Sequence, residues 1–187
     1  LGFLQSRDFL EYALLFAIGQ LGLKTDDVVK SPKRIILAQL NNRGGFVLGV
    51  CNGFQVLCET GLLPGVLMRN AGLTFVCKTV GLTVASENSV FTSGYAKDQV
   101  IRLPVAHHDG NYTADDDLVA RLNGEDRVAF RYTENLNGSR DSIAGVLSKN
   151  RRVLGVMPHP ERAVDAAHGG TDGSRLFSSL VGALESA

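Results

Sequence analysis

Cys51 is the residue of this sequence best placed to act as a nucleophile. It lies in Gly49-Val50-Cys51-Asn52-Gly53, between a short apolar run and a segment with helical spacing. Glycines two residues away on either side relieve crowding, so a strained strand-to-helix turn can lift a nucleophile out of a sheet. The positive end of the helix dipole favours a thiolate, and the backbone amide of Asn52 can form half of an oxyanion hole. The alternative is a buried structural cysteine, because free cysteine is among the most buried residue types.

A thiol nucleophile needs a general base, and the candidates are the four histidines His107, His108, His159 and His168. His159 follows an apolar run and lies in the segment Pro158-His159-Pro160-Glu161. In an extended segment His159 and Glu161 leave the backbone on the same face, so the carboxylate can orient the imidazole. Together with Cys51 they would form a Cys-His-Glu triad. The alternative for His-x-Glu is an ordinary surface turn.

Two other histidines follow a second apolar run, in Ala106-His107-His108-Asp109. Adjacent side chains on a strand point to opposite faces, so at most one of the two histidines is expected to face the same cleft as Cys51. A hydrogen-bonded loop histidine is the alternative for each. His168 has no neighbour in the sequence that singles it out.

The elements that would position these residues predict a single α/β domain with a mixed sheet. Proline at the first position after Ser31 favours a helix over residues 31–39, and the apolar run 46–50 is typical of a strand buried on both faces. Residues 53–61 have helical spacing. Beyond residue 64 the chain is β-rich, with candidate strands at 74–79, 82–85, 100–105, 128–132, 143–147 and 153–156. Residues 134–139 form a turn or binding loop by composition, and a last helix is expected at 175–184.

The composition excludes several classes of function. Nineteen basic and nineteen acidic residues give a formal charge of zero, so neither nucleic acid nor an anionic membrane is an expected partner. Three cysteines without a C-x-x-C pair argue against a zinc site and fit a reducing cytoplasm, and no metal ligands are expected. The most apolar stretch, 9–23, is about 15 residues long, whereas a membrane span needs roughly 20.

Several segments, in this order and spacing, resemble one family. The segments are Val47 to Gln55, Gly61-Leu62-Leu63-Pro64-Gly65, Ala106-His107, Asn137-Gly138-Ser139, Ile143-Ala144-Gly145 and Met157 to Ala163. They resemble the PurQ-type glutaminase subunit of bacterial phosphoribosylformylglycinamidine synthase, a class I glutamine amidotransferase. The likeness covers residues 31–187 and implies one domain over 1–187, with the flavodoxin-like mixed sheet of that family flanked by helices.

The resemblance also implies an activity and its residues. Cys51 would attack the side-chain amide of L-glutamine, His159 would act as base and acid, and Glu161 would orient His159. Gln55 and His107 would contact the substrate. The ammonia would pass to a larger synthase subunit, assisted by a small accessory subunit, which converts formylglycinamide ribonucleotide to the amidine in purine synthesis.

The resemblance implies no cofactor on this chain. ATP and Mg²⁺ would be used by the partner subunit, which agrees with the lack of a G-x-x-x-x-G-K-[ST] loop in this sequence.

The first 30 residues depart from the family pattern. The strand-helix unit with which family members begin, and the loop that supplies their second oxyanion amide, are not recognisable there, so residues 1–30 are expected to be divergent or incomplete. Two alternatives follow. The chain could be a catalytically impaired structural partner of the same complex, or a cysteine amidohydrolase with a different substrate, since fold and nucleophile do not fix the substrate.

Overall fold

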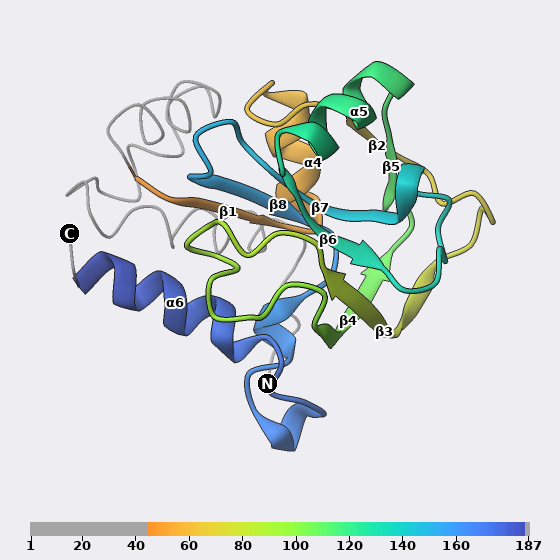
Figure 1. Cartoon of the computed structure of the whole chain (residues 1–187). Helices are drawn as coiled ribbons and strands as arrows, with labels where there is room; N and C mark the ends of the chain where they lie inside the picture. Colours follow the sequence, from red (N-terminus) through yellow and green to blue (C-terminus); the bar gives the residue numbers. More distant parts are fainter. Residues whose placement is uncertain (1–44, 186–187) are drawn as a thin grey trace, which may run out of the picture.

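The central feature of the computed structural model, which describes residues 45–185, is a six-stranded mixed sheet in the order β1-β8-β7-β6-β3-β4 (Figure 1). Its strands are β1 (Val47–Val50), β3 (Val76–Val84), β4 (Val100–His107), β6 (Val128–Tyr132), β7 (Ile143–Leu147) and β8 (Val153–Val156). β1 and β8 run parallel, and the other neighbours are antiparallel. A separate antiparallel pair joins β2 (Val66–Met68) to β5 (Asn111–Thr113). The predicted mixed sheet is confirmed.

Helices cover both faces of this sheet, with α4 (Asn52–Glu59) and α5 (Asp116–Gly124) on one face and α6 (Ser174–Glu185) on the other (Figure 1). Successive side chains of a strand point to opposite faces. Val47 of β1 accordingly belongs to the cluster that α4 covers, and its neighbour Leu48 belongs to the cluster that α6 covers. The continuous apolar run in β1 is therefore explained by burial on both sides.

The prediction of separate strands at 74–79 and 82–85 is wrong, because β3 is continuous from Val76 to Val84. Gly81 stays within the strand and pairs with Arg102. A Cβ at Gly81 would lie 2.5 Å from Oγ1 of Thr133, so the glycine is required by a close approach to the next segment. A glycine that marks a turn and a glycine that is required by close packing cannot be told apart from the local sequence.

Three further elements were not predicted from the sequence, namely β2, β5 and α5. The two strands have three residues each, too few to show an alternating pattern. Helix α5 is capped by Asp115, whose carboxylate accepts a hydrogen bond from the Leu118 N–H at 2.7 Å.

Strand β4 is longer than predicted. It continues through Pro104 to His107, which an edge strand tolerates because the missing N–H faces away from the ladder.

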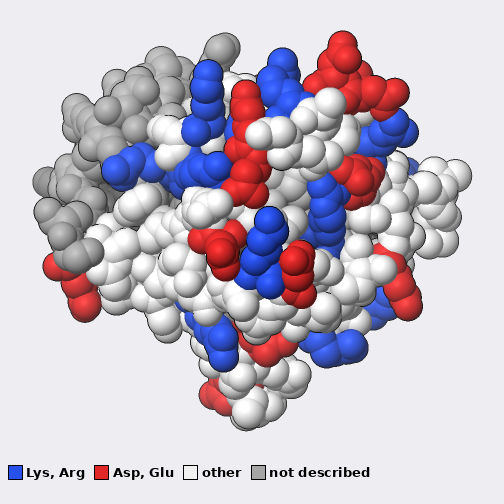
Figure 2. Space-filling model, viewed as in Figure 1, with Lys and Arg blue, Asp and Glu red and all other residues white. Residues whose placement is uncertain are grey.

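The predicted helix at 31–39 and the apolar segment 9–23 lie outside the described residues. No helix within residues 45–185 is long and apolar enough to cross a membrane. On the face shown in Figure 2, basic and acidic side chains alternate without a large area of one sign, as the equal numbers of the two suggest.

Candidate active site

Cys51 lies at the junction of β1 and α4 in a backbone conformation that L-residues rarely adopt, with φ 51° and ψ −107°. Its N–H donates to the carbonyl of Val156 at 2.8 Å, and its carbonyl accepts from the Phe54 N–H at 3.0 Å. The parallel ladder therefore continues to Cys51, and the helix starts at the next residue. A conformation of this kind costs on the order of 1–3 kcal/mol and occurs mainly at functional sites.

The glycine before Cys51 is needed for this turn. A Cβ on Gly49 would lie 2.8 Å from the backbone of Gly53 and 2.4 Å from the side chain of Leu57. The helix can thus approach the end of β1 only because position 49 has no side chain. Asn52 is the first residue of α4, and the N–H groups of a helix's first turn have no intrahelical acceptor.

The His159 segment reaches the same edge of the sheet because β8 is parallel to β1 and adjacent to it. The His159 N–H donates to the carbonyl of Pro104 at 2.8 Å, which fixes the segment against β4. The prediction of an extended His-x-Glu segment is wrong, since Glu161 lies in a short 3-10 helix, η2 (Pro160–Arg162), that His159 caps. Nδ1 of His159 nevertheless lies 2.6 Å from Oε1 of Glu161, so the predicted pair forms.

The surroundings of His159 favour its protonated form. Its burial opposes a charge, but interactions with the Cys51 thiol and the Glu161 carboxylate outweigh this and raise the pKa of His159 to about 9. A carboxylate only accepts hydrogen bonds, so the ring hydrogen lies on Nδ1 and Nε2 is the atom that exchanges a proton. Within the described residues, Nε2 is buried and has no hydrogen-bond partner.

A second histidine, His107, lies at the end of β4 beside this pair. Its side chain is buried, whereas the next side chain, His108, is exposed with its ring 5.4 Å from that of Phe75. The two histidines thus diverge as their positions on a strand predict. The carbonyl of the preceding residue, Ala106, accepts a hydrogen bond from Sγ of Cys51 at 3.8 Å. The end of β4 therefore lies beside the nucleophile.

The chemical state of His107 differs from that of His159. Burial, together with the electrostatic effect of nearby His159, lowers the pKa of His107 to about 4. Its Nδ1 lies 3.0 Å from Oδ1 of Asn70, a residue that no sequence pattern singles out. His107 is therefore neutral at physiological pH.

The loop at 134–139, predicted to be a turn or a binding loop, holds the segment after β4 in place. The side-chain amide of Asn137 donates to the carbonyl of Gly110 at 2.7 Å, and the hydroxyl of Ser139 donates to the same oxygen at 3.2 Å. Both side chains are buried. The observed role of this loop is thus to position the segment that follows His107.

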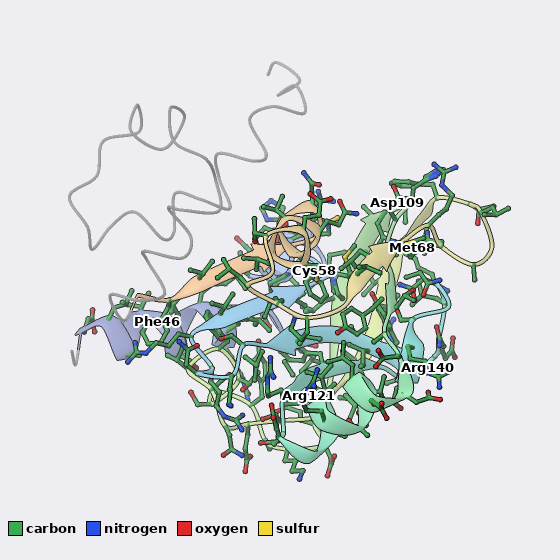
Figure 3. The ribbon with its side chains drawn as sticks, turned by 90° about the horizontal axis from the view of Figure 1, so that it is seen from above. Phe46, Cys58, Met68, Asp109, Arg121 and Arg140 are labelled. Carbon is green, nitrogen blue, oxygen red and sulfur yellow. The ribbon has the colours of Figure 1, made fainter. Side chains whose placement is uncertain are left out.

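Gln55 connects the elbow helix to the segment after β4. Its side-chain amide donates to the carbonyl of Asp109 at 2.7 Å. An adjoining pocket of about 370 Å³ is lined by Gln55, Cys58, Glu59, Val66, Leu67 and Asp109. Cys58 and Asp109, labelled in Figure 3, mark two of the segments around it. Cys51 does not line this pocket, so the pocket adjoins the candidate site without containing the nucleophile.

Two sequence candidates are not joined to this arrangement. His168 is exposed on η3 (Ala166–His168), where its N–H donates to the carbonyl of Asp165. The segment expected to supply a second oxyanion amide, within residues 1–30, lies outside the described residues. The structure therefore brings together Cys51, His159, Glu161 and His107, with Gln55 at the margin.

Known proteins similar to this chain agree with the geometry. Residues 28–172 match the CobB/CobQ-like glutamine amidotransferase domain. Phosphoribosylformylglycinamidine synthase subunit PurQ of Ruegeria pomeroyi is 69% identical over 142 residues, which are 76% of this chain and 64% of that protein. The subunit of the same name from Cereibacter sphaeroides is 62% identical over 155 residues, covering 83% of this chain and 70% of the relative.

A solved structure extends the likeness to three dimensions. PurLQS from Thermotoga maritima contains a chain that is 38% identical, with a TM-score of 0.75, over 90% of this chain and 76% of that one. The present chain spans 64% of the length of the Ruegeria relative. Sequence, fold and the geometry around Cys51 agree, and the chain belongs to the CobB/CobQ-like glutamine amidotransferase family, together with the PurQ subunits that it resembles.

Proposed function

We propose that this protein is a glutaminase subunit, which hydrolyses L-glutamine to glutamate and ammonia. The observation that carries the proposal is the strained Cys51 beside His159, whose Nδ1 is held 2.6 Å from Glu161. In this proposal Cys51 is the nucleophile, His159 is the base and acid, and Glu161 orients the imidazole.

The first half of the reaction forms a thioester. Nε2 of His159, whose protonated form is favoured by its surroundings, holds the proton of the Cys51 thiol, and the thiolate attacks the side-chain carbonyl carbon of glutamine. The π electrons of the carbonyl move to its oxygen, where the N–H of Asn52 donates to the oxyanion. His159 then gives its proton to the amide nitrogen, and the carbon–nitrogen bond breaks with its electron pair on nitrogen. Ammonia leaves, and the glutamyl group remains on Cys51.

The second half releases glutamate. Water gives a proton to Nε2 of His159 as its oxygen attacks the thioester carbon, and a second oxyanion forms. When the carbonyl reforms, the carbon–sulfur bond breaks with its electron pair on sulfur, and Cys51 regains the proton from His159. The carbonyl oxygen occupies the same place in both halves, so one set of donors serves both.

The proposal extends to substrate and partners. Gln55 and His107 would contact the glutamine. The ammonia would pass to a larger synthase subunit, with a small accessory subunit, that converts formylglycinamide ribonucleotide to formylglycinamidine ribonucleotide. The names of the relatives, a synthase subunit in two species and PurLQS in a third, support this. ATP and Mg²⁺ would be used by the partner subunit, and this chain would bind no cofactor. The free cysteines of the described residues suit a cytoplasmic location.

Replacing Cys51 tests the proposal in the complex reconstituted with the synthase partner. Cys51→Ala removes the nucleophile, so glutamine-dependent amidine formation should fall by more than about 10³-fold, while formation from added ammonium salt should be unchanged. The matched control is Cys77→Ala, which alters an exposed cysteine of β3 and should leave both rates unchanged.

Three outcomes would contradict the proposal. Equal loss of the glutamine- and ammonia-dependent rates would mean that Cys51 is structural. Absence of a glutamyl thioester in the rapidly quenched wild-type complex would indicate a catalytically impaired partner. Faster ammonia release from asparagine or peptide amides than from glutamine would indicate a cysteine amidohydrolase of another substrate.

A further inference from the structure

One ring nitrogen of His107 is buried beside the nucleophile. The residue is only 3% exposed, and its Nε2 has no hydrogen-bond partner among the described residues. More than nine in ten buried polar groups in proteins are hydrogen-bonded, so an unpaired one needs an explanation. In a site built around a nucleophile, a bound substrate is the natural partner.

Asn70 determines which hydrogen-bonding character this nitrogen has. Nδ2 of Asn70 donates to the carbonyls of Thr74 and His107, at 2.9 Å each, so both of its hydrogens are used. Oδ1 faces Nδ1 of His107 at 3.0 Å and also accepts from the Gly110 N–H at 3.1 Å. The reversed amide would set an NH₂ group against the N–H of Gly110, so the assignment of oxygen and nitrogen is fixed. An accepting oxygen requires the hydrogen on Nδ1, which leaves a lone pair on Nε2.

The neighbours of His107 place it at the reacting groups. The carbonyl of Ala106, one residue earlier, is 3.8 Å from Sγ of Cys51. The carbonyl of Pro104, on the same strand, accepts from the N–H of His159. After burial, His159 is the strongest influence on the pKa of His107, and the two together lower it to about 4. His107 is therefore a neutral acceptor and not a second base.

We propose that Nε2 of His107 accepts a hydrogen bond from the nitrogen that leaves glutamine, and that Asn70 is a positioning residue that holds His107 in the required tautomer. The inference rests on the glutaminase function proposed above. In the tetrahedral intermediate the leaving nitrogen carries two hydrogens and one lone pair. Binding one hydrogen to His107 turns the lone pair toward His159, which supplies the proton. An ester has no hydrogen on its leaving oxygen, so this contact favours amides over esters.

The test compares glutamine with glutamate γ-methyl ester as substrates of the reconstituted complex. His107→Phe keeps a ring but removes the acceptor, so kcat for glutamine should fall by about 10- to 100-fold, and kcat for the ester by less than about threefold. KM for glutamine should change little, because the contact orients the nitrogen as the bond breaks. His107→Gln, whose amide oxygen can reach the place of Nε2, should restore part of the preference for glutamine.

Two further variants sharpen the test. Asn70→Ala removes the oxygen that holds the hydrogen of His107 on Nδ1. The ratio of glutamine to ester hydrolysis should therefore fall, as it does in His107→Phe. His108→Phe makes the same substitution at the adjacent exposed position and should leave both rates within about twofold of the wild type, because that side chain is exposed and lies against Phe75.

The outcomes separate this inference from the function on which it rests. Equal losses on the two substrates in His107→Phe, or an unchanged ratio in Asn70→Ala, would overturn the role of His107 while the glutaminase function stands. If His107→Phe does not fold, the ratio in Asn70→Ala decides. A wild-type complex that hydrolyses neither substrate would refute the glutaminase function and the inference with it.

Discussion

The segment after β4 and the segment after β8 each bring a buried histidine to the same edge of the sheet. In both, Nδ1 is held by an oxygen acceptor, and Nε2 is buried with no hydrogen-bond partner among residues 45–185. The acceptors differ. His159 faces a carboxylate and has a pKa raised to about 9, whereas His107 faces the amide of Asn70 and has a pKa lowered to about 4.

The comparison shows that the charge of one partner can separate a proton-exchanging histidine from an accepting one. Burial penalises the charged form of both rings. The Glu161 carboxylate, in direct contact with His159, helps to offset this penalty, whereas the weaker attraction of Asp109 does not offset it at His107. The two segments are also fixed by different means. Proline on both sides restricts the backbone at His159, while Gly110 packs so closely on His107 that a Cβ there would lie 2.3 Å from the ring.

The largest expected difference between the two segments is in the rate of glutamine hydrolysis. His159→Gln removes the group that moves every proton, so kcat should fall by about 10³- to 10⁴-fold, well beyond the loss in His107→Gln. Steady-state release of glutamate by the reconstituted complex measures it, with the exposed His168→Gln as control. A loss of less than about tenfold in His159→Gln would mean that another group serves as the base.

Exchanging the charges of the two partners is a more specific test of the comparison. Glu161→Gln removes the anion beside His159 and should lower its pKa by about one to two units, with about a 10²-fold loss of kcat. Asn70→Asp adds an anion beside His107 and should raise its pKa by a similar amount. NMR titration of the two ring protons checks both. Unchanged pKa values in either variant would show that burial, and not the partner's charge, sets the state of that ring.

The contrast also explains what could be predicted from the sequence. Cys51 is marked by its flanking glycines, and Glu161 is two residues from His159, so local sequence contains the evidence for that part of the site. Parallel strands then bring the two segments to one edge. Asn70 is 37 residues from His107, and no local pattern connects them. The predicted break between residues 79 and 82 is wrong for the same reason, because the residue that Gly81 approaches, Thr133, is 52 positions away.

The smallest of the expected effects is on stability, where the two histidines should act in opposite directions with pH. The pKa of His107 falls from 6.5 in the unfolded chain to about 4, so the unfolded state binds the extra proton and stability rises with pH between about 4 and 6.5. The pKa of His159 rises from 6.5 to about 9, so its stabilising contribution is complete below 6.5 and is lost as the pH rises to 9.

Urea unfolding at pH 4.5, 6.5 and 8.5 should resolve these two contributions. His107→Gln should flatten the acid side of the stability profile, and His159→Gln should flatten the alkaline side. Each change should amount to about 2 kcal/mol. This is less than the full value of about 1.4 kcal/mol for every unit by which the pKa shifts, because solvent screens part of the interaction. Burial opposes the charged form of Asp141, but its hydrogen bonds to Asn123 and Arg131 and the charge of Arg131 outweigh burial and lower its pKa, so Asp141 also makes stability fall in acid. The difference between each variant and the wild type removes that common term. If both variants change the same side of the profile, the two rings do not carry the opposite preferences for a proton on which their separate roles depend.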